Sequence, residues 1–182
     1  MFLLNFRTTF ITLTAIPLSL IVAVLVLKAL DYSINTMTLG GMTIAIGELV
    51  DDAIVDVENI FRRLRENAQR PAGERRGPLV VIRDASIEIR SSIVYATLII
   101  ALVFLPMFFL SGVEGRLLKP LGVSYVTSIF ASLIVALSLT PALAAYLLTQ
   151  GRFLEREGEG PVVGVLKALY RATLAVVLPL VV

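Results

Sequence analysis

Five carboxylates lie close together in a stretch of the chain that is otherwise apolar. They are Glu48, Asp51, Asp52, Asp56 and Glu58. They follow an uncharged run from Ser33 to Gly47, and the two stretches together are long enough to cross a bilayer as a helix. An ionised carboxylate in hydrocarbon costs about 3 kcal/mol on insertion scales, so intramembrane acids are typical of proton or ion pathways.

The spacing of these acids favours proton transfer. At about 100° per residue, Glu48, Asp51 and Asp52 fall on one side of a helix, which can face a bundle interior or a water-filled cavity. Adjacent carboxylates repel each other when both are charged, and burial also disfavours charge, so such a pair can bind and release a proton. We predict that Asp51 and Asp52 form a proton relay, with Glu48 as a candidate accessory acid.

The remaining two acids come closer to the polar segment that follows. Asp56 and Glu58 lie at the margins of the acidic side, where water is near. We interpret both as interfacial charges or helix-packing partners, and keep Glu58 as a second candidate accessory member of the relay. Gly40, Gly41 and Gly47 on the same predicted helix are expected to permit close helix packing.

The composition is that of a membrane protein. Of 182 residues, 57% are hydrophobic, whereas soluble domains are about 45–50% apolar. The net charge of +2 is too small to indicate a nucleic-acid partner. Because the chain has no Cys and no His, it has no thiolate chemistry, no His-based triad and no zinc site of the usual kind, and we expect no bound cofactor.

An enzyme is not expected either. An intramembrane aspartyl protease would need two Asp residues that face each other from separate helices. Here both members of the pair lie on one helix, and no other predicted span carries an acid.

The hydropathy pattern predicts an all-α fold, a polytopic bundle of transmembrane helices within residues 1–150. The four complete spans are expected at about 8–29, 34–61, 91–112 and 121–149, with a polar loop over 62–90. Residues 151–171 are predicted as a linker and surface helix. Residues 172–182 then begin a fifth span that is shorter than the roughly 20 residues a span requires, which indicates a fragment of a longer protein.

The basic residues predict the orientation of the bundle. All but three of the 16 Lys and Arg residues fall on one side of the predicted spans, and the exceptions are Lys28, Arg116 and Lys119. The positive-inside rule places the loop over 62–90 in the cytoplasm. The acid-bearing helix then runs from the outside to the inside.

Four segments of the sequence resemble the membrane domain of resistance-nodulation-division (RND) efflux permeases. They are LLNFRTTFITLTAIPLSLI, SINTMTLGGMTIAIGELVDDAIVDVENI, VFLPMFFLSGVEGRLLKPLGVSYVTSIFASL and LSLTPALAAYLL. The resemblance covers the third to sixth transmembrane helices of the N-terminal half and the start of the seventh. It implies a proton-driven efflux transporter of the bacterial inner membrane, in which Asp51 and Asp52 occupy the relay positions and a Lys of the second half pairs with them.

The same resemblance implies partners outside this sequence. The chain is expected to contact the lipid bilayer and the rest of an RND protomer. The protomer is expected to form a homotrimer with a periplasmic adaptor and an outer-membrane channel.

The exported substrate is less constrained by the sequence. The phrases NTMTLGG, GELVDDA and DVENIFRRLREN resemble the heavy-metal efflux branch, in which Met37 would occupy a position that handles soft cations. Leu49 and Ala144 stand where further Met residues are expected, and Glu48 is an extra acid. Met37 as a packing residue, a multidrug-type permease fragment and a truncated product without transport activity remain alternatives.

Overall fold

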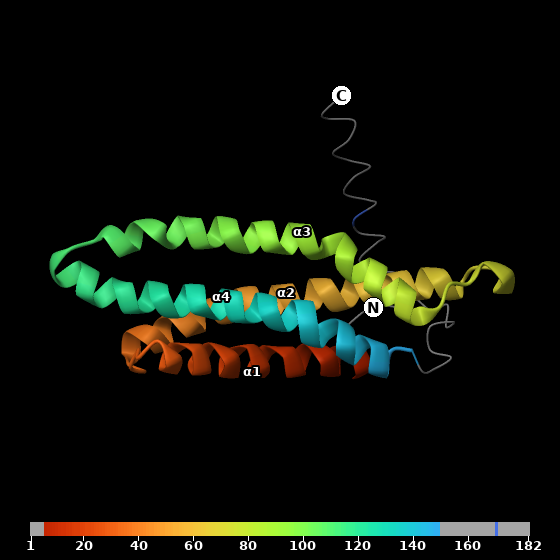
Figure 1. Ribbon diagram of the computed structural model, residues 1–182, viewed down its shortest axis with the longest axis horizontal. Coiled ribbons are helices and arrows are strands. Elements are labelled where there is room, and N and C mark those ends of the chain that lie inside the picture. Colours follow the sequence, from red (N-terminus) through yellow and green to blue (C-terminus); the bar gives the residue numbers. More distant parts are fainter. Residues whose placement is uncertain (1–5, 150–169, 171–182) are drawn as a thin grey trace, which may run out of the picture.

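The computed structural model describes residues 6–149 and Tyr170. Within residues 6–149 the chain forms four long helices and no strand: α1 (Phe6–Ala29), α2 (Thr36–Ala68), α3 (Pro78–Phe104) and α4 (Gly112–Leu147). Two short 3₁₀ helices, η2 (Ala72–Glu74) and η3 (Leu105–Phe109), lie in the connections. The long helices run side by side along the long axis of the molecule (Figure 1). The all-α prediction is confirmed.

Three helical segments of the described part are long and apolar enough to cross a membrane. They are α1, Pro78–Phe109 and α4. Helix α2 has 33 residues, so it is also long enough, but its carboxylates make it less apolar. It contacts α1, α3 and α4, and it therefore belongs to the same bundle. The chain is an integral membrane protein.

The bundle has two chemically different ends (Figure 1). We call one the arginine-rich end, because it holds the connection between α2 and α3, which carries Arg70, Arg75 and Arg76. The start of α1 and the end of α4 lie there too. The other, which we call the far end, holds the α1–α2 and α3–α4 connections. Helices α2 and α4 are thus parallel to each other and antiparallel to α1 and α3.

Local signals account for the helix ends at both sides of the bundle. At the far end, the Asn35 side chain accepts hydrogen bonds from the backbone N–H groups of Met37 and Thr38, and the Thr38 hydroxyl accepts one from the N–H of Asn35. This capping box satisfies donors that the first turn of α2 would leave free. At the arginine-rich end, Arg7 donates to the carbonyl of Leu147 at 2.8 Å, which caps the last turn of α4.

The core is built differently along the bundle. At the arginine-rich end, all four helices contribute large apolar side chains to one cluster, among them Ile11, Ile60, Ile82 and Leu148. Beside the acids, α1, α2 and α4 meet through smaller residues, Ala15, Ala53 and Val135. A third cluster, around Leu49, Tyr125 and Ile129, joins α2 to α4 further toward the far end.

One glycine fixes the distance between α2 and α4. A Cβ atom on Gly41 would lie 2.1 Å from the Ser124 hydroxyl oxygen and 2.3 Å from the carbonyl oxygen of Leu121. The prediction of close packing is therefore confirmed for Gly41. It is wrong for Gly47, where a Cβ atom would meet nothing within 4 Å.

Several helices extend past the predicted spans. Helix α2 continues to Ala68 and α3 begins at Pro78, so most of the polar stretch over 62–90 is helical. The second half of the predicted loop is continuous with the following span in α3, because no residue between Pro78 and Phe104 breaks the helix. At the far end, α4 already begins at Gly112. The predictions for 151–171 and 172–182 lie outside the described residues, apart from Tyr170.

Candidate functional site

The acids of α2 divide into a buried row and exposed flanks. Glu48 and Asp52 are half-buried, and Asp56 is only 3% exposed. These three residues are four positions apart, so they form one row along the helix. Asp51 and Glu58 are exposed on the flanks. The structure thus keeps Asp51 beside Asp52 in sequence, but only Asp52 turns toward the neighbouring helices.

We call Glu48, Asp52 and Asp56 the acidic row. Its members nearer the far end, Glu48 and Asp52, face an aromatic pair. Tyr125 of α4 is buried and lies close enough to Glu48 and Asp52 to interact electrostatically with both. Its ring stacks on Phe104 of α3, with centroids 4.0 Å apart and an angle of 17° between the planes. The stacking contact restricts the ring of Tyr125, whose phenol lies within electrostatic range of the two carboxyl groups.

The member of the acidic row nearest the arginine-rich end, Asp56, interacts with a cation. Arg90 of α3 is the basic residue that interacts electrostatically with Asp56, and Asp52 is the other charged group that acts on it. No ion pair joins Asp56 to Arg90. Asp56 therefore has both a carboxyl group, that of Asp52, and the Arg90 guanidinium within electrostatic range.

Within residues 6–149, none of the five acids of α2 between Glu48 and Glu58 forms an ion pair. One carboxyl oxygen of Asp52, Oδ2, is buried and has no hydrogen-bond partner. The hydroxyls of Ser86 on α3 and Thr140 on α4 are also buried without a partner. Buried polar atoms of this kind are rare and are typical of functional sites.

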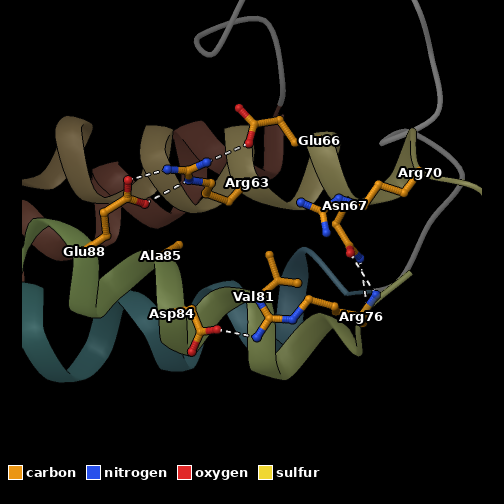
Figure 2. Close-up of a pocket in the computed structure, with 9 residues that line it drawn as sticks. All are labelled: Arg63, Glu66, Asn67, Arg70, Arg76, Val81, Asp84, Ala85 and Glu88. Atoms are coloured by element: carbon orange, nitrogen blue, oxygen red, sulfur yellow. Dashed lines mark hydrogen bonds and ion pairs between the residues drawn. The ribbon is translucent and has the colours of Figure 1, made fainter. Parts of the chain in front are cut away.

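The same helix carries a contrasting set of charges two turns further on. Figure 2 shows this ion-pair cluster, which comprises Arg63, Glu66, Arg76, Asp84 and Glu88. Arg63 of α2 forms a bidentate pair with Glu88 of α3 and a second pair with Glu66 at 2.9 Å. Arg76 pairs with Asp84 near the start of α3. Every carboxylate of the cluster has a cationic partner.

Pairing changes the protonation behaviour of the cluster. Hydrogen bonds from Arg63 hold the pKa of Glu88 below its ordinary value, and those from Arg76 and Arg83 lower the pKa of Asp84. Hydrogen bonds to Glu88 and Glu66 raise the pKa of Arg63. These groups therefore stay charged at neutral pH.

Two amides of α2 bond to α3 and to the α2–α3 connection beside the cluster. The Asn59 amide donates to the carbonyl of Ala85 at 2.9 Å and its oxygen accepts from Arg62 at 2.7 Å. The Asn67 side chain exchanges two hydrogen bonds of 2.9 Å with the backbone of Arg76. The two amides flank Arg63 along α2, so the helix is held to α3 at Asn59 and to the α2–α3 connection at Asn67.

Met37 lies away from the acidic row. It occupies the first turn of α2 at the far end and is half-buried. Fifteen residues of helix separate it from Asp52, which corresponds to about 22 Å along the axis. No group of three or more His, Cys, Asp or Glu in the described residues could hold a metal ion. The structure does not bring Met37 and the acids together.

Sequence reasoning underrated Asp56 and missed Tyr125. Asp56 is buried in the bundle, which fits the helix-packing alternative of its interpretation rather than an exposed interfacial charge. The spacing of four residues between Glu48, Asp52 and Asp56 was the available signal. For Tyr125 the only signal was a hydroxyl-bearing aromatic in an apolar span, and its position beside the acids depends on how α4 packs on α2.

Comparison with known proteins identifies the family. Residues 1–180 match the AcrB/AcrD/AcrF family. The swarming motility protein SwrC of Bacillus subtilis is 40% identical over 144 residues, which cover 79% of this chain and 13% of that protein. The multidrug resistance protein MdtF of Escherichia coli is 37% identical over 148 residues, covering 81% and 14%.

A third relative is SilA of Salmonella typhimurium, named as a cation efflux system protein. It is 36% identical over 149 residues, which cover 80% of this chain and 14% of SilA. The chain thus spans about one seventh of the length of the curated relatives that it matches. With a family match over nearly all of its residues, the chain belongs to the AcrB/AcrD/AcrF family of RND permeases, a class of transporters.

Proposed function

We propose that this chain is the part of a proton-driven efflux permease that carries the proton-relay acids. In this proposal, Asp51 and Asp52 bind and release the transported proton, with Glu48 and Glu58 as accessory acids. The permease lies in the bacterial inner membrane with the arginine-rich end in the cytoplasm. Proton motive force drives export, and no bound cofactor is required.

One observation carries the proposal: Asp52 has a buried carboxyl oxygen without a hydrogen bond, in a helix packed among three apolar helices. A fully satisfied carboxylate would serve packing, whereas an unsatisfied one costs free energy and is retained for a function. Protonation would remove the charge and add an O–H donor. That change can favour a different packing of α2 against α3 and α4.

The test uses the complete permease that contains this segment, reconstituted in liposomes with a proton gradient. We expect Asp51→Asn and Asp52→Asn each to abolish gradient-driven export and the coupled proton flux, with near-normal assembly, because Asn keeps the size and hydrogen bonding of Asp without its titration. Glu74→Gln, in the exposed α2–α3 connection, is a matched control. Wild-type export in both Asp variants would refute the relay.

We propose a cation of the heavy-metal class as the substrate. The likeness to SilA supports this, while the likeness to MdtF supports a multidrug substrate. Met37→Leu in the complete permease distinguishes a soft-metal ligand from a packing residue. If Met37 is a ligand, resistance to Cu(I) or Ag(I) falls while proton coupling persists, because a thioether binds soft ions and Leu does not. Unchanged resistance would assign Met37 to packing.

We further propose that the complete protomer works as a homotrimer with a periplasmic adaptor and an outer-membrane channel. Family membership supports this assembly. Crosslinking of the complete permease in cells, followed by mass determination, tests it. A monomeric permease without an adaptor would contradict the proposal.

A further inference from the structure

A cavity at the far end has a lining unlike that of any other site described above. It has a volume of about 350 Å³ and lies between the α1–α2 turn and the start of α4. Tyr32 comes from the turn, and Ser111, Gly112, Arg116 and Lys119 come from the α3–α4 connection and the first turns of α4. The volume lies within the range of about 300–1,000 Å³ that is usual for small-ligand sites.

The lining is cationic. Arg116 and Lys119 are its only charged residues, and neither forms an ion pair within residues 6–149. The acids of this end, Asp31 and Glu114, are not among the lining residues. Glu114 points away from both cations, because it is separated from each by well over a quarter of a helical turn. Two unpaired cations without a facing carboxylate fit an anion.

Glycines make the site accessible from the connection. Gly112 has a φ of +71°, which lets the chain turn sharply into α4, and a Cβ atom there would meet nothing within 4 Å. At Gly115 a Cβ atom would lie 2.3 Å from the carbonyl oxygen of Leu110. The connection therefore folds tightly over α4 at Gly115 and leaves the space beside Gly112 open.

Exposed apolar side chains are neighbours of the lining residues along the chain. Phe109 is 80% exposed, Val113 is 73% exposed, and Leu117 is also exposed. Each is next in sequence to a residue that lines the cavity, at the end of helices that are long enough to cross a bilayer. In a bilayer this end would lie at the depth of the lipid headgroups. Basic residues beside exposed apolar ones are typical of segments that lie in the membrane interface.

We propose that this cavity binds the phosphate of an anionic phospholipid. The phosphate lies between the Arg116 guanidinium and the Lys119 ammonium, and the Tyr32 hydroxyl donates a third hydrogen bond. The acyl chains run along Phe109 and Val113. A free phosphate ion would engage the same cations but would not use the apolar surface, which is why the observations favour a lipid.

The test is a titration of the purified 182-residue chain in neutral detergent with dioleoylphosphatidylglycerol, followed by native mass spectrometry. We expect a single saturable lipid adduct. Arg116→Gln and Lys119→Gln should each weaken it about fivefold, because each basic residue near the headgroup contributes on that order. Arg116→Lys should retain most of the binding. Far-ultraviolet circular dichroism checks that each variant keeps its helix content.

Lys28→Gln is the matched control, since it removes one positive charge from the same end but does not line the cavity. Equal binding in all variants would overturn the proposal, and so would an equal loss with Lys28→Gln, which would indicate unspecific attraction. Inorganic phosphate in large excess distinguishes the two sources. Displacement of the lipid by phosphate, or phosphate binding that depends on Arg116, would assign the cavity to a soluble anion instead.

Discussion

Two regions of α2 carry a similar density of charge but differ in whether their carboxyl groups are paired with cations. In the acidic row, Glu48, Asp52 and Asp56 lie against other helices without an ion pair in the described part of the chain. In the ion-pair cluster, Arg63 holds two carboxylates and is itself partly exposed. Burial is thus greatest where pairing is absent, the reverse of what stability alone would favour.

The difference indicates a division of labour along one helix. Paired charges near water keep a fixed protonation state and add little free energy, but they define which faces of α2 and α3 meet. Unpaired carboxyl groups inside the bundle can change their protonation state, and each change alters the local packing. A helix that is fixed at one end and titratable in the middle is suited to a switch between two arrangements.

The largest expected effect separates the two regions by function. In the complete permease, Asp52→Asn should lower export by about 100-fold or more, the scale of a lost proton-transfer group. Glu88→Gln, which removes the partner of Arg63 in the cluster, should leave export within about twofold. Export measured at matched expression decides this. A comparable loss in both variants would mean that the cluster belongs to the relay.

Labelling should establish which end of the bundle faces the outside of the cell, from which protons enter. Cysteines placed at Ser33 and at Gln69 lie in the turns at opposite ends of α2. In intact cells, an impermeant maleimide should label Ser33→Cys about tenfold more than Gln69→Cys, since the positive-inside rule puts the arginine-rich end in the cytoplasm. Permeabilised cells serve as the control and should label both. Preferential labelling at position 69 would reverse the orientation.

A moderate effect on stability should come from the amide beside the cluster. Asn59→Ala leaves the carbonyl of Ala85 without its donor in a buried position, which should cost about 1–3 kcal/mol. Gln69→Ala, an exposed change one residue beyond α2, should cost less than about 0.5 kcal/mol. Denaturant unfolding in mixed micelles measures both. Equal stability of the two variants would contradict a stabilising role for the hydrogen bond from Asn59 to Ala85.

The smallest expected effect is the pH dependence of the cluster. Folding lowers the pKa of Glu88 from an ordinary value of 4.5 and that of Asp84 from 3.8. Their contribution to stability is therefore fully present above about pH 4.5 and is lost as the pH falls through the lower folded values. The unfolding midpoint should drop between pH 5 and pH 3, by less in Glu88→Gln than in the unchanged chain. An identical pH profile would contradict the pairing.

The helical fold could be predicted because its determinants are local. Long apolar runs and the Asn35–Thr38 capping pattern can be recognised in the sequence, and the structure has the corresponding helices. The positions at which the helices end were harder to predict from the sequence. The charged stretch from Arg62 to Ala68 continues α2 because Arg62 and Arg63 each pair with Glu66 at helical spacing, and charge alone does not end a helix.

The candidate site was only partly accessible to sequence reasoning. Spacing placed Asp52 correctly on an inner side, because that depends on a single helix. It could not tell that Asp51 would be exposed and Asp56 buried, since this requires the rotation of α2 against α3 and α4. That rotation depends on a contact far away in the sequence, the approach of Gly41 to Ser124.

The hydrogen bond from Arg7 to Leu147 has a consequence for biosynthesis. Its partners are 140 residues apart, so at about 5–20 residues per second the ribosome makes the acceptor roughly 7–28 s after the donor. During that interval α1 sits in the translocon or the bilayer without α4. Two of its buried hydroxyls do not need α4 as a partner, because Thr12 and Ser19 donate to the carbonyls of Thr8 and Ala15 within α1 itself. Helix α1 can therefore enter lipid with those hydroxyls hydrogen-bonded, before α4 is available to contact it.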